Sequence, residues 1–148
     1  MKGRIVIGSD HAGFFLKESL KRFLAERGFE VEDVGAFSSD PVDYPDICES
    51  AVRKYEEGGY DFGILICGTG VGMSVAANKF RGIRAALCAD PLTARLSRQH
   101  NDANFLCLGA RIIGEELAKE IARVFLETPF EGGRHIPRLE KIKALEER

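Results

Sequence analysis

Short apolar runs alternate with amphipathic stretches five times along the chain, and this alternation is the feature that most limits its fold. Apolar runs of about four to eight residues are typical of buried strands, and apolar residues three or four positions apart are typical of helices. Strands are expected at residues 4–8, 29–34, 62–67, 83–88 and 105–108. Helices are expected at residues 14–27, 47–57, 72–79, 91–99 and 114–127, with a loop over residues 37–46 and a charged helix after Pro137.

Strands and helices in this order predict an α/β fold, a parallel sheet with helices on both faces. Right-handed crossovers place the first strand beside the third and leave the second at an edge. The order of the last two strands does not follow from the pattern. Without an internal repeat or a linker, residues 1–148 are expected to form a single domain.

The composition excludes several classes of protein. A net charge of −2 gives no basic field for nucleic acid or for a membrane surface. No apolar run approaches the roughly 20 residues of a membrane helix, and the charged start does not read as a signal peptide. The four cysteines lack zinc-site spacing. They are expected to be reduced thiols in a cytoplasmic protein.

In a sheet of this kind, ligands bind outside the carboxyl ends of the strands. This edge is called the rim below. The loops expected there are residues 9–13, 68–72, 89–91 and 109–114. The residues that suggest chemistry lie in these loops or close to them, which indicates an active site at the rim.

The strongest candidate is the run Cys67-Gly68-Thr69-Gly70-Val71-Gly72, where a cysteine ends a strand and a glycine-rich turn follows. Glycines let backbone N–H groups converge on an anion, and the same surroundings lower the pKa of a thiol. The alternative is a buried structural cysteine beside a packing turn. The spacing matches neither a dinucleotide fingerprint nor a P-loop, so no nucleotide cofactor is expected.

Other candidates are an acid, imidazoles and cations. Asp10-His11 ends the first strand, although an Asp at this position is also a common helix cap. His100-Asn101 follows the fourth helix and is expected to approach the same rim, although a His near a helix end often only interacts with the helix dipole. Arg111 lies just past the fifth strand, as a cation at the rim.

Arg134 directly follows a glycine turn at residues 132–133, and Arg138 follows Pro137 at the start of the charged C-terminal helix. Guanidinium groups suit phosphate oxygens, although a solvated basic turn explains the same residues. The helix over residues 138–148 is too polar to form a core by itself, which suggests a surface or partner-contacting element.

Together these motifs resemble the ribose-5-phosphate isomerase B family, which also includes galactose-6-phosphate and allose-6-phosphate isomerases. The matching segments are residues 8–13, 67–72, 97–101 and 132–135. The resemblance implies a three-layer α/β/α sandwich of Rossmann-like or flavodoxin-like type, with a five-stranded parallel sheet in the order 2-1-3-5-4 and a C-terminal helical extension. It also implies a homodimer or dimer of dimers with shared active sites, without cofactor or metal.

The resemblance further assigns roles. Cys67 would be the base that moves a proton between C1 and C2, His100 the acid that opens the sugar ring, and Asp10 a helper in ring opening or proton traffic. The amides of Gly68 to Gly72, with Thr69 and Asn101, would hold the enediolate and the sugar hydroxyls. The residues expected to hold the phosphate are His11, Arg111, Arg134 and Arg138, the last two from the partner subunit.

Three functions are compatible with this fold. The first is interconversion of ribose 5-phosphate and ribulose 5-phosphate, a step of the pentose phosphate pathway. The second is the same chemistry on an aldohexose 6-phosphate, such as allose or galactose 6-phosphate. The third, a flavodoxin-like binding module, explains the fold but not a thiol, an imidazole and a carboxylate gathered at one rim. The sequence favours the first.

Overall fold

A computed structural model describes residues 2–148 as alternating strands and helices. The strands are β1 (Gly3–Ser9), β2 (Phe29–Asp33), β3 (Phe62–Cys67), β4 (Ala85–Leu87) and β5 (Phe105–Gly109). The helices are α1 (Phe14–Glu26), α2 (Tyr44–Glu56), α3 (Val71–Ala77), α4 (Pro91–Asn101), α5 (Glu115–Glu127) and α6 (Ile136–Leu145), and two short 3-10 turns are η1 (His11–Gly13) and η2 (Gly133–His135). The largest departure from the sequence prediction is the start of α2, at Tyr44 inside the expected loop. Pro45 occupies the first turn of this helix, where a missing N–H costs nothing.

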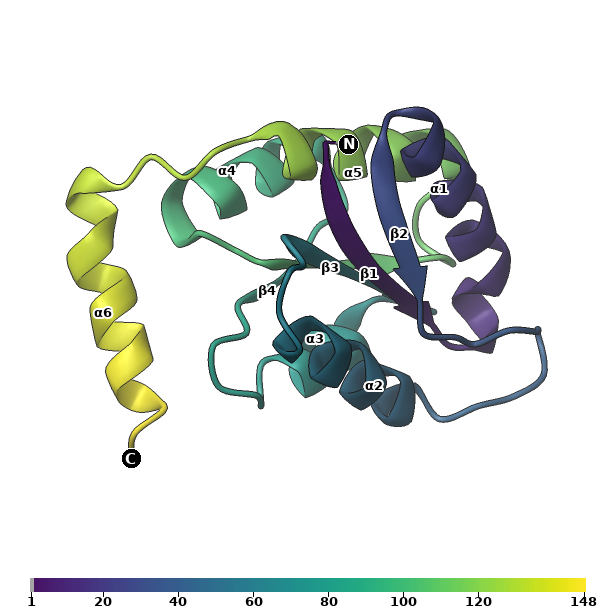
Figure 1. Cartoon of the computed structure of the whole chain (residues 1–148), viewed down its shortest axis with the longest axis horizontal. Coiled ribbons are helices and arrows are strands. Elements are labelled where there is room, and N and C mark those ends of the chain that lie inside the picture. The colour runs from purple at the N-terminus through teal and green to yellow at the C-terminus, as the bar shows by residue number, and fades with distance from the viewer. Residues whose placement is uncertain (1) are drawn as a thin grey trace.

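All strand pairs are parallel, and the order is β2-β1-β3-β5-β4. The expected α/β fold and the expected strand order are therefore confirmed. Helices α1, α4 and α5 cover one face of the sheet, and α2 and α3 cover the other (Figure 1). β3 lies in the middle and is buried almost throughout, as a strand covered on both faces should be.

Alternation along β3 divides the core in two. Ile64 and Ile66 pack toward α1 and α5, whereas Leu65 and Cys67 pack toward α2 and α3. This alternation fixes the direction of the Cys67 side chain, because successive side chains of a strand point to opposite faces. The candidate thiol therefore lies on the α2–α3 side of the sheet.

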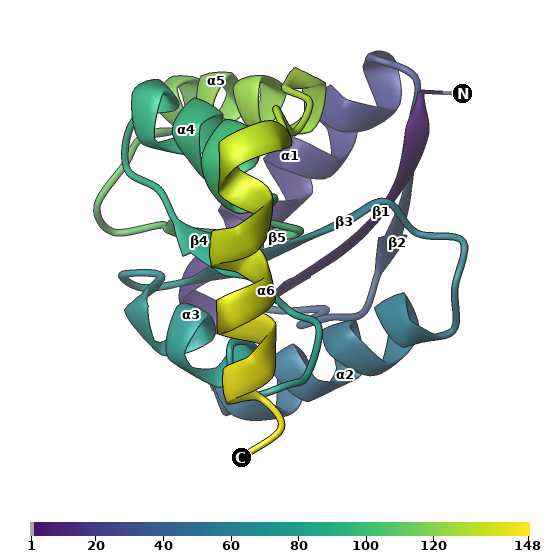
Figure 2. The ribbon, with the colours of Figure 1, turned by 90° about the vertical axis from the view of Figure 1, so that its left-hand side faces the viewer.

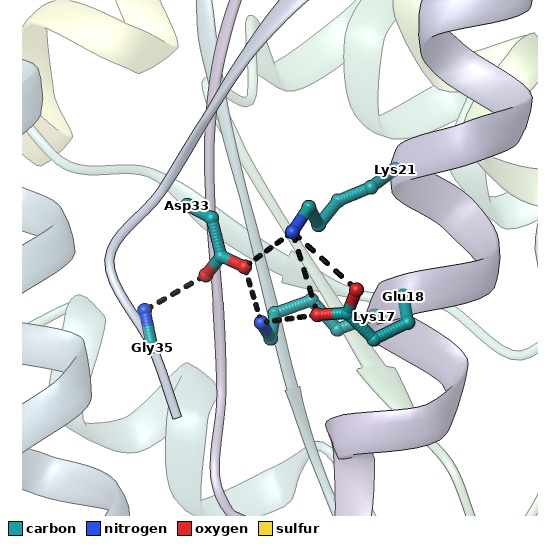
Figure 3. Close-up of polar contacts among 5 residues, drawn as sticks. All are labelled: Lys17, Glu18, Lys21, Asp33 and Gly35. Carbon is teal, nitrogen blue, oxygen red and sulfur yellow. Dashed lines mark hydrogen bonds and ion pairs between the residues drawn. The ribbon is translucent and has the colours of Figure 1, made fainter. Parts of the chain in front are cut away.

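A buried ionic cluster connects α1 to the carboxyl end of β2 (Figure 3). Lys17 has a fully buried side chain, and its Nζ lies 2.5 Å from Oδ2 of Asp33 and 3.2 Å from Glu18. Lys21 also contacts Asp33, at 2.8 Å, and the other oxygen of Asp33 accepts the N–H of Gly35. The cluster ties the start of the loop between β2 and α2 to α1, next to the rim.

The last helix stands apart from the three layers. α6 lies beside the body on the β4 side (Figures 1 and 2), and no residue between Ile136 and Leu145 is buried. Its end is tied down by a hydrogen bond from the Gly82 N–H to Glu146 at 3.0 Å. Within residues 2–148, no helix combines the length and apolar character that a membrane crossing requires.

Candidate active site

The rim begins with Asp10, directly after β1. Its Oδ1 accepts the N–H groups of Ala12 at 3.0 Å and Gly13 at 3.2 Å, so this carboxylate does cap the turn that follows. Both bonds use Oδ1, which leaves Oδ2 for other partners. A Cβ at Gly13 would lie 2.6 Å from the Ile66 side chain, so only glycine lets the turn pack this closely against the end of β3.

His11 contacts the loop that leads into α2. Its Nδ1 accepts the N–H of Val42 at 3.2 Å. In the neutral imidazole the other nitrogen, Nε2, then carries the proton and can donate a hydrogen bond. With Nδ1 accepting this bond, Nε2 of His11 offers a donor at the rim, as an anionic ligand requires.

Cys67 ends β3 and faces the glycine turn. Its Sγ accepts the N–H of Gly70 at 3.2 Å. Gly70 has a φ of 81°, and a Cβ there would lie 2.9 Å from the Leu108 backbone, so the turn requires glycine at this position. Thr69 supports the same turn, since its Oγ1 accepts the N–H of Val71 at 3.2 Å.

The other three cysteines lie in surroundings that favour the neutral thiol. Burial raises the pKa of Cys48 to about 11, and burial raises the pKa of Cys88 to about 11 as well. The pKa of Cys107 lies well above its ordinary value, chiefly because of burial. These thiols stay protonated near neutral pH, and none of the three has a glycine turn beside it.

Arg111 adds a cation beside Cys67. The backbone N–H of Arg111 donates to the carbonyl of Gly68 at 2.9 Å, and the backbone N–H of Ala110 donates to the carbonyl of Cys67 at 2.9 Å. A Cβ at Gly68 would lie 3.3 Å from Nη1 of Arg111, so the guanidinium packs directly over the turn. The rim thus gathers a carboxylate, an imidazole, a thiol and a guanidinium, which can bind an anion and move protons.

The expectation that His100 and Asn101 approach the rim is wrong. α4 begins after the carboxyl end of β4 and ends before the amino end of β5. Since β4 and β5 are parallel neighbours, α4 has to return to the amino ends of the strands. Its 11 residues span about 16 Å. A hydrogen bond from the Asn104 N–H to the carbonyl of Arg84, which precedes β4, holds the following segment at this opposite edge, called the amino edge below.

Arg134 and Arg138 also belong to the amino edge. α5 starts near the rim and runs back, and the segment after it packs against the end of α4. The Glu131 N–H donates to the carbonyl of Gln99 at 3.1 Å, and the ring of His135 stacks on that of His100 with centroids 4.5 Å apart. The candidate residues therefore form two groups at opposite edges of the sheet. The group at the rim is Asp10, His11, Cys67 and Arg111, and the group at the amino edge is His100, Asn101, Arg134 and Arg138.

His135 was not singled out by the sequence, yet the structure buries it against His100. Burial lowers the pKa of His135, and the nearby His100 and Arg134 lower it further. Tyr44 was missed as well. A Cβ at Gly72 would lie 2.6 Å from the Tyr44 ring, so the ring rests on the glycine turn at the rim. No local pattern marks either residue, because each is brought to its place by the loop that precedes it.

Comparison with known proteins identifies the family. A sequence model of the ribose/galactose isomerase family matches residues 5–142. The chain belongs to this family. The resemblance drawn from the sequence motifs is therefore confirmed.

Individual relatives agree. The chain is 52% identical to ribose-5-phosphate isomerase B of Escherichia coli, with 98% of this chain and 97% of the relative covered. It is 44% identical to a D-erythrulose-4-phosphate isomerase of Pectobacterium atrosepticum, over 93% of this chain and 91% of that protein. The crystal structure of a ribose 5-phosphate isomerase from Thermotoga maritima matches with a TM-score of 0.93 and 55% identity, covering 96% of this chain and 98% of that one.

Proposed function

We propose that this isomerase interconverts D-ribose 5-phosphate and D-ribulose 5-phosphate. The observation that carries the proposal is the group formed by Cys67, Asp10, His11 and Arg111 at the rim, in a chain so similar to ribose-5-phosphate isomerases. The substrate is a phosphorylated sugar, and the reaction is redox-neutral because one carbonyl replaces another. The proposed location is the cytoplasm, since four free, buried thiols suit a reducing compartment.

The proposed reaction starts with ring opening. His100 protonates the ring oxygen while Asp10 takes the proton of the O1 hydroxyl, which yields the open-chain aldehyde. The thiolate of Cys67 then removes the proton from C2 and returns it to C1, while a proton passes from O2 to O1. Backbone N–H groups from residues 68–72, with Thr69 and Asn101, hold the enediolate oxygens and the sugar hydroxyls. Donors of this kind matter because removing one typically costs about 3–4 kcal/mol in the transition state.

Phosphate recognition supplies the positioning energy. His11 and Arg111 are the proposed ligands from the rim, and Arg134 and Arg138 the proposed ligands from the amino edge. Binding the phosphate far from C1 and C2 can lower the barrier without contacting the reacting atoms. Arginine suits this task because its planar fork matches phosphate oxygens.

Since the two residue sets stand at opposite edges of one sheet, we propose that the site is shared in a two-fold dimer. One protomer supplies Asp10, Cys67 and Arg111, and its partner supplies His100, Asn101, Arg134 and Arg138. Apolar side chains exposed at both ends support this pairing. Val71, Leu92 and Ile112 are 50%, 52% and 61% exposed near the rim, and Leu145 of α6 is 60% exposed.

Steady-state turnover tests the substrate. Purified protein would be assayed with ribose 5-phosphate, allose 6-phosphate, galactose 6-phosphate and erythrulose 4-phosphate. The last is included because a relative at 44% identity carries that name. We expect the highest kcat/KM with ribose 5-phosphate. A higher value with a hexose phosphate would establish the alternative function, and no turnover of any of the four would overturn the proposal.

A further inference from the structure

Three side chains that commonly bind metals meet at the amino edge, outside the rim. They are His100 at the end of α4, and Glu131 and His135 on either side of the glycine turn before α6. Nε2 of His100 and Nε2 of His135 each lie 3.6 Å from the same oxygen, Oε1 of Glu131. One ligand atom from each residue falls within 4.8 Å of the other two.

The backbone holds this cluster together. Gly132 and Gly133 have φ angles of 70° and 56°, which other residues rarely adopt. They turn the chain so that Glu131 and His135 face the same point. The Glu131 N–H donates to the carbonyl of Gln99, next to His100, and this bond fixes the turn to α4. The three groups are therefore brought together by backbone geometry, and not by chance meetings of long surface side chains.

The distances exceed those of hydrogen bonds but suit a shared ion. Nitrogen and oxygen at 3.6 Å are too far apart for a good hydrogen bond, for which about 2.7–3.2 Å is usual. Ligand atoms about 2.0–2.1 Å from a tetrahedral zinc ion are about 3.3 Å from each other. The two nitrogen–oxygen distances need to shorten by only a few tenths of an ångström. The two imidazole nitrogens, which lie within 4.8 Å of each other, would be brought to the same point by a rotation of the stacked rings, now 19° from parallel.

The ligand types select the metal. Two imidazoles and one carboxylate suit zinc and its neighbours in the first transition row, whereas Mg²⁺ and Ca²⁺ prefer oxygen ligands. The side chain of His135 is 7% exposed, while those of His100 and Glu131 are 36% and 51% exposed. One wall of the cluster is thus buried and the other is open, which gives an ion an entry path and leaves a fourth position for water.

We propose that His100, Glu131 and His135 form a binding site for a divalent transition metal such as zinc, and that an ion bound there inhibits the isomerase. The inhibition rests on the proposed function, because the ion would occupy the imidazole that is proposed to open the sugar ring. Metal binding by itself does not depend on that proposal. The metal is an inhibitor in this scheme and takes no part in turnover.

Binding is tested without any activity assay. Metal-free, full-length protein is titrated with Zn²⁺ by calorimetry and with Co²⁺ by its visible absorption bands. We expect one ion per chain, an affinity about tenfold or more lower in Glu131→Gln, and a greater loss in His135→Asn. Glu131 is exposed, so its variant should fold normally, and circular dichroism checks both variants.

Two control variants sharpen the result. The chain has three histidines, and His11→Asn removes the one outside the cluster, so it should bind the metal as the wild type does. Cys67→Ala removes the proposed catalytic thiol and should also bind normally. Equal affinity in the wild type, Glu131→Gln and His135→Asn would overturn the site. A loss of binding in Cys67→Ala would do the same, because the ion would then be on the thiol.

Inhibition is measured as turnover of ribose 5-phosphate with Zn²⁺, Co²⁺ or Mg²⁺ added. Zn²⁺ and Co²⁺ should inhibit the wild type reversibly, with recovery on adding a chelator, and Mg²⁺ should not. Glu131→Gln should need about tenfold more Zn²⁺ for the same inhibition. Full turnover with the site occupied would overturn the inhibitory role. Failure of the proposed function would look different, since metal-free protein would then turn over no ribose 5-phosphate while still binding the ion.

Discussion

Gly109, the strand partner of Cys67 in the sheet, lies directly against the backbone of Thr69. A Cβ at Gly109 would be 2.5 Å from the Thr69 carbonyl oxygen and 2.9 Å from its Cα. Backbone atoms at this distance cannot move aside as the end of a flexible side chain can. The absence of a side chain at Gly109 therefore sets how closely the turn after Cys67 packs against the end of β5.

We expect Gly109→Ala to displace this turn and to lower kcat by about tenfold to a hundredfold, because small shifts of positioning groups cost this much. Overpacking should lower the free energy of unfolding by about 1–3 kcal/mol. The matched control is Gly114→Ala in the same segment, where an added Cβ meets nothing within 4 Å. It should keep kcat. Equal kcat values for both variants would show that the turn tolerates the shift.

Replacing the thiol tests the proposed base. Cys67→Ala should abolish isomerisation, since Cys67 is the group proposed to carry the proton between C2 and C1, while the fold and phosphate-ligand binding remain. Turnover is followed by ribulose 5-phosphate formation and binding by calorimetry with an inert phosphorylated analogue. Cys67→Ser, which keeps a hydrogen-bond acceptor for Gly70, separates loss of the base from loss of the turn. Ordinary turnover by Cys67→Ala would remove the thiol from the mechanism.

His100 is expected to act mainly in ring opening. His100→Ala should therefore lose more activity on ribose 5-phosphate, which is largely cyclic in water, than on erythrose 4-phosphate. In the latter sugar the phosphate occupies O4, so no five-membered ring can form. The measurement is the ratio of kcat/KM for the two sugars in the variant and the wild type. An equal loss on both would indicate that His100 positions the substrate instead.

Mixing inactive subunits tests the shared site. Each site of a mixed dimer of Cys67→Ala with Arg134→Ala/Arg138→Ala carries either no lesion or all lesions. Random exchange makes about half of the dimers mixed, so about a quarter of wild-type activity should return. If the arginines served the site of their own chain, every site would keep a lesion and the mixture would stay inert.

His100 extends the same test with a matched control. Because it lies with Arg134 at the amino edge, His100→Ala should also complement Cys67→Ala. It should not complement Arg134→Ala/Arg138→Ala. Both lesions lie at the amino edge, so every site of a mixed dimer receives a defective amino edge from one chain or the other. Mass spectrometry of mixed dimers verifies exchange. Recovery in this last pair would separate His100 from the arginines and contradict the proposed division.

The cluster around Lys17 predicts an unusual order of stabilities. In Asp33→Asn, the fully buried ammonium of Lys17 keeps Glu18 as its acidic partner among residues 2–148. This substitution should lower the free energy of unfolding by about 3–5 kcal/mol. Lys17→Met should cost less, because Asp33 keeps Lys21 and the Gly35 N–H. The double variant should be more stable than Asp33→Asn alone. Urea unfolding at one fixed protein concentration measures all four proteins, and additive losses would argue against the coupling.

The same cluster predicts acid sensitivity. Burial by itself would raise the pKa of Asp33, but hydrogen bonds from Lys17, Lys21 and Gly35 hold it below its ordinary value of 3.8. A carboxyl with a lowered pKa in the folded state stabilises the protein above the unfolded pKa and loses this contribution as the pH falls through the folded one. Wild-type stability should therefore drop below about pH 4 more steeply than that of the Lys17→Met/Asp33→Asn double variant. Parallel curves would show that Asp33 contributes little.

Much of the fold could be predicted because the pattern is local. The strand at residues 62–67 was predicted to the residue, since its apolar run is bounded by charge and by glycine. The chemical candidates at the rim were also found, because parallel strands bring their carboxyl ends to one edge. The sequence pattern did not give the order of β4 and β5, which depends on long-range packing and came from the family resemblance.

The positions of site residues were predicted less well where they depend on tertiary structure. His100 was expected at the rim although it lies at the end of the fourth helix, and this crossover helix carries its last residues to the amino edge of the sheet. The approach of Glu131 and His135 to His100 depends on two left-handed glycines and on one backbone bond to α4. None of these leaves a periodic signal in the chain.

The exposure of helix α6 has a consequence for how the protein behaves at low concentration. No residue of α6 is buried within one chain. In the proposed dimer, α6 would gain its packing from the partner subunit, beside the arginines that complete the partner's site. Separation of the subunits would then remove stability and catalysis in a single event. Specific activity and melting temperature should decline together on dilution, so the cell would hold no pool of folded, half-active monomers.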